Sequence, residues 1–193
     1  MPPKPKYTKE QIIEAALDVV SQQGMDALTA KELGHALHTS ATPIFTVFDS
    51  MQAVQEAVKA AAMERFASYA HKTDVDMPIF KQVGIQMILF AKEEPNLYRL
   101  IFMSKNSDVK SFADIYAHLG SVAEECLAAI QRDYGLSGAD AKALFEHSWI
   151  HTYGIGTLCA TGMCDFTKEE ISAMLTQDFT AMMLLLKKGE RNR

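Results

Sequence analysis

Hydrophobic residues recur every three to four positions along most of the chain, which is the spacing of one buried face of an α-helix. The first such run follows Thr8, which can form a capping box with Gln11, and ends at Gly24, a typical helix stop. No segment shows the alternating pattern of a half-buried strand. The sequence therefore predicts an all-α fold.

Residues 28–48 predict two short helices joined by a tight turn. Thr29 is expected to cap the first helix, with Glu32 completing a capping box, and Ser40 or Thr42 to cap the second. Pro43 then lies in the first turn of the second helix, where its missing N–H has no helical partner. This arrangement is a helix-turn-helix, which offers its second helix to a partner.

The turn and its exposed face follow from the same spacing. His38 occupies the turn, and His is among the few residues other than Gly that adopt a positive φ. Ile44 and Phe48 are four residues apart and are expected to point inward. The residues left facing outward are Ala41, Thr42, Phe45 and Thr46.

The rest of the chain repeats the helical pattern. Further helices are predicted over residues 50–72, 78–93, 96–103, 109–134, 139–161 and 167–189. The eighth contains a run of small residues from Gly154 to Gly162, and the ninth has a Met-rich stripe. Both features are explained if these two helices pack across a two-fold axis in a homodimer.

Composition narrows the class of protein. Of the 193 residues, 48% are hydrophobic, enough for a substantial core, but no apolar run reaches the roughly 18 residues of a membrane-spanning helix. The first ten residues lack the apolar region of a secretory signal. The 3 cysteines are an odd number and widely spread, which favours reduced thiols and a cytoplasmic location.

The charge is acidic, with a formal net charge of −5. Residues 1–70 contain six Lys or Arg and eight Asp or Glu, although DNA-binding domains usually carry a basic surface. The proline-rich residues 1–6 carry Lys4 and Lys6, which either contact DNA phosphates or belong to an untethered tail.

The order of these parts resembles the TetR family of bacterial transcriptional regulators. Residues 8–58 match that family in detail, and the segment Glu94-Pro95-Asn96-Leu97-Tyr98-Arg99-Leu100 looks like the start of its sixth helix. The resemblance implies a nine-helix homodimeric repressor whose last two helices form the dimer interface. A ligand in the C-terminal domain would separate the two DNA-binding domains and release operator DNA.

The expected DNA contacts have two sources. The charge of the N-terminal arm indicates Lys4, Lys6 and Lys9, and the resemblance implies Thr29, Lys31, Ser40, Ala41, Thr42, Pro43, Phe45 and Thr46. Four positions depart from the family pattern, because His38 replaces a Gly, Ala41 a basic residue, Phe45 a Tyr and Met51 a Lys. Without long polar side chains on this face, we expect weak binding and an A·T-tolerant site read partly by shape.

The C-terminal helices carry many Met, aromatic and His residues that either form plain core or line a largely apolar cavity. Those expected at a ligand site are Met87, Phe90, Phe102, Met103, Phe112, Tyr116, His147, Trp149, His151 and Tyr153. The predicted effector is a small hydrophobic or aromatic molecule.

The expected organisation is a DNA-binding domain over residues 1–50, a connecting helix over 50–72 and an effector-binding and dimerisation domain over 73–193. An alternative keeps this fold but uses a degenerate helix-turn-helix as a ligand- or protein-binding module.

Other functions have little support in the sequence. His147 and His151 are four residues apart and could chelate a metal with Glu146, Cys159 or Cys164, but no second ligand cluster supports such a site. The chain has no Gly-rich phosphate loop, nucleophile elbow or CxxC motif, and a dyad of His151 with Cys159 or Cys164 would need a favourable geometry. We therefore predict no enzyme activity, catalytic residue, metal or cofactor.

Overall fold

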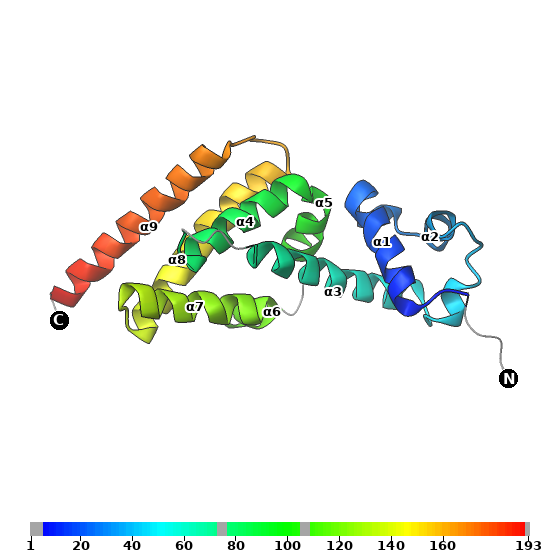
Figure 1. Cartoon of the computed structure of the whole chain (residues 1–193), viewed down its shortest axis with the longest axis horizontal. Coiled ribbons are helices and arrows are strands. Elements are labelled where there is room, and N and C mark those ends of the chain that lie inside the picture. Colours follow the sequence, from blue (N-terminus) through cyan, green and yellow to red (C-terminus); the bar gives the residue numbers. More distant parts are fainter. Residues whose placement is uncertain (1–5, 73–76, 105–108, 192–193) are drawn as a thin grey trace. The chain divides into compact units, whose positions relative to one another are not determined.

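The computed structural model describes residues 6–72, 77–104 and 109–191, and all of its regular structure is helical (Figure 1). This confirms the all-α prediction. The α-helices of the described residues are α1 (Lys9–Gln23), α2 (Ala30–Ala36), α3 (Met51–Ala70), α4 (Ile79–Glu93), α5 (Pro95–Tyr98), α6 (Phe112–Leu119), α7 (Ser121–Tyr134), α8 (Gly138–Ala160) and α9 (Lys168–Arg191). Within these residues, no helix combines the length and apolarity needed to cross a membrane.

The chain divides into two compact units. The N-terminal unit comprises Met1–Phe66 and Glu94–Ser104, and the C-terminal unit comprises Ala67–Glu93 and Lys105–Arg193. The sequence predicted a division near residues 50 and 72, with everything beyond 72 in one domain. In the structure, α5 and the turn after it return to the N-terminal unit instead.

The N-terminal unit is built on well-capped helices around a dry core. The Thr8 hydroxyl accepts a hydrogen bond from the Gln11 N–H, and the Gln11 side chain accepts one from the Thr8 N–H, which confirms the predicted capping box. Ile12, Leu33 and Phe66 are fully buried. Because α1, α2 and α3 each contribute to this core, their amphipathic faces fix the packing.

The structure differs from the sequence prediction at the second helix of the helix-turn-helix. Residues 41–48 form only one 3₁₀ turn, Ile44–Thr46, so neither Ser40 nor Thr42 caps an α-helix. The Thr46 hydroxyl donates a 2.6 Å hydrogen bond to the Pro43 carbonyl, and the Thr46 N–H donates to the same oxygen. Local side-chain bonds and a run rich in β-branched residues favour this turn over a helix.

The turn before it has the predicted backbone. Among the residues that the structure describes, His38 is the one residue other than Gly with a positive φ, which is 51°. Gly34 in α2 is needed nearby, because a Cβ there would lie 3.0 Å from the Thr39 carbonyl oxygen and 3.3 Å from the Ser40 carbonyl carbon. The chain therefore folds tightly back over the end of α2.

The predicted helix over residues 109–134 is wrong in one respect, because it is two helices. Gly120 has φ 53° and separates α6 from α7. A capping box between Ser111 and Asp114 starts α6, and Gly135, with φ 66°, ends α7 as predicted. Hydrophobic spacing continues through Gly120, so periodicity alone does not reveal the break.

In the C-terminal unit, α4, α8 and α9 pack together (Figure 1). Their shared core contains Ile88, Ile155, Ile171 and Leu175. Gly84 allows the close approach of α4, because a Cβ at this position would lie 3.3 Å from the Leu175 side chain. These three helices provide most of the frame for the cavity described below.

We expect Gly34→Ala to destabilise the protein, because the new methyl meets backbone atoms that cannot move aside. Overpacking costs about 1 to 3 kcal/mol, more than the roughly 1 kcal/mol that Ala gains in helix propensity. Gly138→Ala is the matched control, since a Cβ there meets nothing within 4 Å. Thermal unfolding should show a lower Tm for Gly34→Ala only. Equal Tm values for the two variants would contradict this account of the turn.

Candidate functional site

The 3₁₀ turn and its approach present a small, neutral surface. Ser40, Thr42 and Thr46 are exposed, Ala41 and Pro43 are half-buried, and the Phe45 ring is 46% exposed. Ile44 and Phe48 are buried beneath them, as predicted. Phe45 is the one large apolar side chain that this turn leaves open to solvent, so the surface is suited to contacts with another molecule.

The residues preceding α1 hold the turn in place. The Tyr7 hydroxyl donates a 2.6 Å hydrogen bond to the Leu37 carbonyl, and the Lys6 ammonium donates one of 3.3 Å to the Thr39 hydroxyl. The Lys9 ammonium lies 5.6 Å from the centre of the Phe48 ring. Positive charge therefore lies beside the turn even though the turn itself is neutral.

The other predicted DNA contacts are placed as follows. Lys31 is exposed on α2, while the Thr29 hydroxyl accepts a 3.1 Å hydrogen bond from the Glu32 N–H and caps that helix. Lys4 lies outside the described residues. The structure thus brings Lys6 and the 39–46 segment together and leaves Lys31 on the neighbouring helix.

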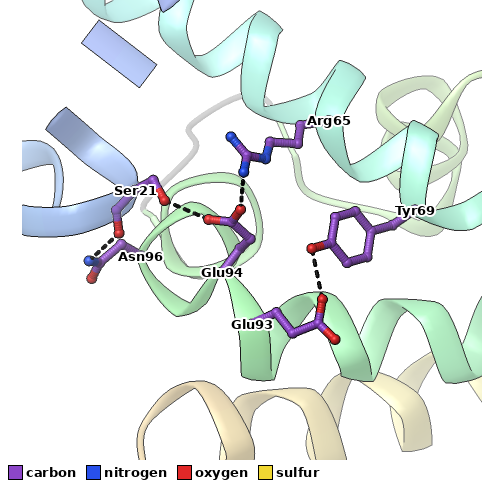
Figure 2. A network of polar contacts seen from close by, with 6 residues as sticks. All are labelled: Ser21, Arg65, Tyr69, Glu93, Glu94 and Asn96. Atoms are coloured by element: carbon purple, nitrogen blue, oxygen red, sulfur yellow. Dashed lines mark hydrogen bonds and ion pairs between the residues drawn. The ribbon is translucent and has the colours of Figure 1, made fainter. Parts of the chain in front are cut away.

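A buried carboxylate joins three segments of the N-terminal unit (Figure 2). The Glu94 side chain is 8% exposed, forms an ion pair with Arg65 of α3 and accepts a 2.6 Å hydrogen bond from the Ser21 hydroxyl of α1. The Asn96 side chain donates a 2.9 Å bond to the Ser21 carbonyl. A lone buried carboxylate is costly, so each of these partners stabilises the docked position of α5.

Figure 2 also shows that the preceding residue, Glu93, makes a separate contact. Glu93 ends α4 in the C-terminal unit, where it accepts a 2.8 Å hydrogen bond from the Tyr69 hydroxyl. Two consecutive acidic residues are therefore bound in different units. The sequence did not predict this network, because the segment Glu94-Pro95-Asn96 indicates the start of a helix but not the distant partners of its side chains.

The C-terminal unit encloses a cavity of about 310 Å³. Its walls come from α4, α7, α8 and α9 and include Phe80, Val83, Met87, Val122, Cys126, Tyr134, Phe145, Trp149, Leu175 and Phe179. This volume and largely apolar lining are typical of sites for small organic molecules.

The cavity also contains a few polar groups. Asp178 of α9 lines it with a side chain that is 9% exposed, and its two oxygens accept hydrogen bonds from His147 (2.9 Å) and Ser148 (3.2 Å). Burial raises the pKa of the Cys126 thiol to about 12, so that lining residue is uncharged at neutral pH. Lys81 contributes the remaining charged side chain of the lining.

Only part of the predicted ligand set lines this cavity. Met87 and Trp149 do. Phe90 is buried, with its ring centre 5.1 Å from that of Tyr69, and Phe102 and Met103 belong to the N-terminal unit. Phe112, Tyr116 and Tyr153 are not lining residues, and His147 and His151 lie beside Asp178 outside the lining. Helical spacing identifies a buried face but not which neighbours that face meets.

The described residues give no support to the postulated metal site or to Cys159 as a nucleophile. No group of three or more His, Cys, Asp or Glu side chains there is placed to hold a metal. The Glu146 carboxylate instead accepts a 2.9 Å hydrogen bond from the Tyr116 hydroxyl. Burial raises the pKa of the Cys159 thiol, which keeps it protonated and a poor nucleophile.

Comparisons with known proteins agree with this geometry. Residues 12–58 match the family model for bacterial regulatory proteins of the tetR family. A curated protein of Mycobacterium tuberculosis described as an uncharacterized HTH-type transcriptional regulator is 24% identical over 193 residues, covering 97% of this chain and 84% of that protein.

Solved structures share the fold. One is a transcriptional regulator of the TetR family from Vibrio parahaemolyticus, with a TM-score of 0.65, 16% identity, and 90% of this chain and 97% of that chain covered. Another is a TetR variant from Acinetobacter baumannii in complex with minocycline. Its TM-score is 0.61 at 14% identity, and the match covers 95% of this chain and 98% of that chain.

The Glu94–Arg65 pair should contribute measurably to stability. We expect Arg65→Met to cost about 1.5 to 3 kcal/mol, because it leaves a buried carboxylate with one partner fewer. The same substitution in a Glu94→Gln background should cost clearly less. Tyr69→Phe is the control, since its exposed bond to Glu93 is worth about 1 kcal/mol at most. Denaturant unfolding measures all four variants, and additive effects of Arg65→Met and Glu94→Gln would show that the pair does not interact.

Proposed function

We propose that this chain, which is similar to bacterial regulatory proteins of the tetR family, is a ligand-responsive transcriptional repressor that binds operator DNA as a homodimer. The observation that carries this proposal is the exposed 39–46 segment inside the matched residues 12–58, in a chain that also holds an apolar cavity. Action on the bacterial chromosome places the protein in the cytoplasm, and no enzyme activity is needed.

The exposed segment determines how this protein would read DNA. It carries hydroxyl, methyl and phenyl groups but no Arg, Lys, Asn or Gln that could make a bidentate contact to a base. Thr46 and Phe45 can contact thymine methyl groups, while Lys6, Lys9 and Lys31 neutralise phosphates. We therefore propose an A·T-tolerant operator recognised partly by its shape.

The cavity is the proposed effector site. Its aromatic and aliphatic walls suit a largely apolar molecule, and its size suits one comparable with a drug fragment. A similar fold binds minocycline in the Acinetobacter baumannii protein. Binding here would favour a state of the dimer that holds operator DNA less tightly, which is the differential affinity that release requires.

The proposed dimer uses α8 and α9. Ile150 on α8 is 61% exposed, and Leu184 and Leu185 on α9 are 58% and 63% exposed. Gly154 lies four residues after Ile150, and a Cβ there would meet nothing within 4 Å in this subunit. An apolar face with a small residue at its centre is suited to close packing against a second copy.

A degenerate helix-turn-helix remains a second candidate. It is favoured by the acidic balance of residues 1–70 and by the reduction of the second helix to one 3₁₀ turn. In that case the protein would bind a ligand or another protein without a specific operator.

DNA selection with the purified protein at two salt concentrations separates these candidates. We expect an enriched A·T-tolerant sequence. The slope of log K against log[salt] should be no steeper than roughly −7, because Lys4, Lys6, Lys9 and Lys31 of each subunit give about eight phosphate contacts per dimer. Lys31→Gln should flatten the slope by about 2 units, whereas Lys59→Gln, on the exposed side of α3, should not. Failure to enrich any sequence would favour the degenerate module.

Charge placed in the dimer interface should separate the subunits. Ile150→Glu buries an unpaired carboxylate on association, so we expect a monomer at micromolar concentration. Met163→Glu is the control, because Met163 is 74% exposed after the end of α8. Sedimentation equilibrium distinguishes the two variants. A dimeric Ile150→Glu variant would place the interface elsewhere.

A further inference from the structure

We infer that the cavity of the C-terminal unit selects lipophilic cations, meaning apolar molecules that carry an amine or quaternary ammonium group. The inference rests on the proposed function, because it assigns a chemical class to the effector of the same cavity. It depends on three features of the lining, which are one fixed carboxylate, a set of aromatic rings, and one lysine whose side chain is half-buried.

The carboxylate is Asp178. Its side chain is 9% exposed and lines a cavity whose walls are otherwise mainly hydrocarbon. A buried negative charge is costly unless it is paired, so this group favours a positively charged ligand. Its position in the middle of α9, with one oxygen bonded to Ser148 of α8, prevents it from turning out to solvent.

The protein's own partners leave this charge available. The Asp178 carboxylate accepts one bond at each oxygen, from His147 at 2.9 Å and from Ser148 at 3.2 Å, although it offers about four acceptor sites. His151 lies farther away, with its Nδ1 4.0 Å from the carboxylate. No Lys or Arg of the described residues forms an ion pair with Asp178, and the two bonds leave acceptor positions on its oxygens for a ligand.

The aromatic rings complete a site for a cation. Phe145 and Trp149 lie nearly parallel, with ring centres 6.1 Å apart and an angle of 10° between the ring planes. Phe179 is 4.8 Å from Tyr134 and 6.4 Å from Phe80, again between ring centres. All five residues line the cavity. Ring faces attract cations, Trp most strongly, and such sets of rings recognise quaternary ammonium groups.

Lys81 is the competing feature, because a lysine in the lining could instead attract an anion. Its side chain is half-buried, so its flexible stem can contribute to the wall while the ammonium reaches water. Asp178 has no such freedom. The charge that stays inside the cavity is therefore negative.

The test uses three probes that differ mainly in charge. Benzyltrimethylammonium is the cation, neopentylbenzene is its neutral counterpart with carbon in place of nitrogen, and 3-phenylpropanoate is the anion. The chain has a single tryptophan, Trp149, which lines the cavity, so its fluorescence reports binding directly. We expect the full-length protein to bind the cation at least about tenfold more tightly than the neutral probe.

Asp178→Asn should remove this preference. The variant keeps the side-chain shape but loses the charge, so the ratio of cation to neutral affinity should fall to about one. The ratio is taken within each variant, so a general change in stability cancels. Asp165→Asn is the matched control, because Asp165 is 90% exposed and does not line the cavity. It should keep the ratio of the parent protein.

Several outcomes would overturn the inference. Equal affinity for the cation and the neutral probe would show a ligand cavity without charge selection, which leaves the proposed function intact. Tighter binding of the anion, lost in Lys81→Gln, would assign the opposite charge to the ligand. If no probe alters Trp149 fluorescence, the inference is wrong, and the DNA selection decides separately whether the proposed function survives.

Discussion

The burial of the Glu94 carboxylate is the constraint on which the arrangement of the chain depends. Glu94 is held by Ser21 and Arg65, so the residues after α4 must fold with α1 and α3 rather than continue in the C-terminal unit. α4 supplies walls of the cavity and ends at Glu93, one residue before this network. The covalent chain thus passes directly from a wall of the cavity in the C-terminal unit to the polar network of the N-terminal unit.

Much of the fold could be predicted from local chemistry, since caps and glycines act within a few residues. The Thr8 capping box, the positive φ of His38 and the stop at Gly135 all appeared as expected. Gly120 was missed because hydrophobic spacing continues across it, and the 3₁₀ turn over Ile44–Thr46 was missed because its hydroxyl bond competes with a helix in a way that spacing does not record.

The candidate sites were less predictable for a related reason. Periodicity found Met87 and Trp149, but it also selected Phe90 and Phe102, which pack against other rings and do not line the cavity. Asp178 was not foreseen, because a single acidic residue on an amphipathic helix usually faces water. Only the three-dimensional packing of α8 on α9 shows that this carboxylate is enclosed.

We propose that the cavity and the 39–46 turn are coupled, and coupling between two binding sites must be reciprocal. The most direct measurement is the affinity of benzyltrimethylammonium, followed by Trp149 fluorescence, with and without a saturating amount of a selected DNA duplex. We expect DNA to weaken cation binding by the same factor by which the cation weakens DNA binding, about 5- to 150-fold. An unchanged cation affinity on saturation with DNA would contradict it.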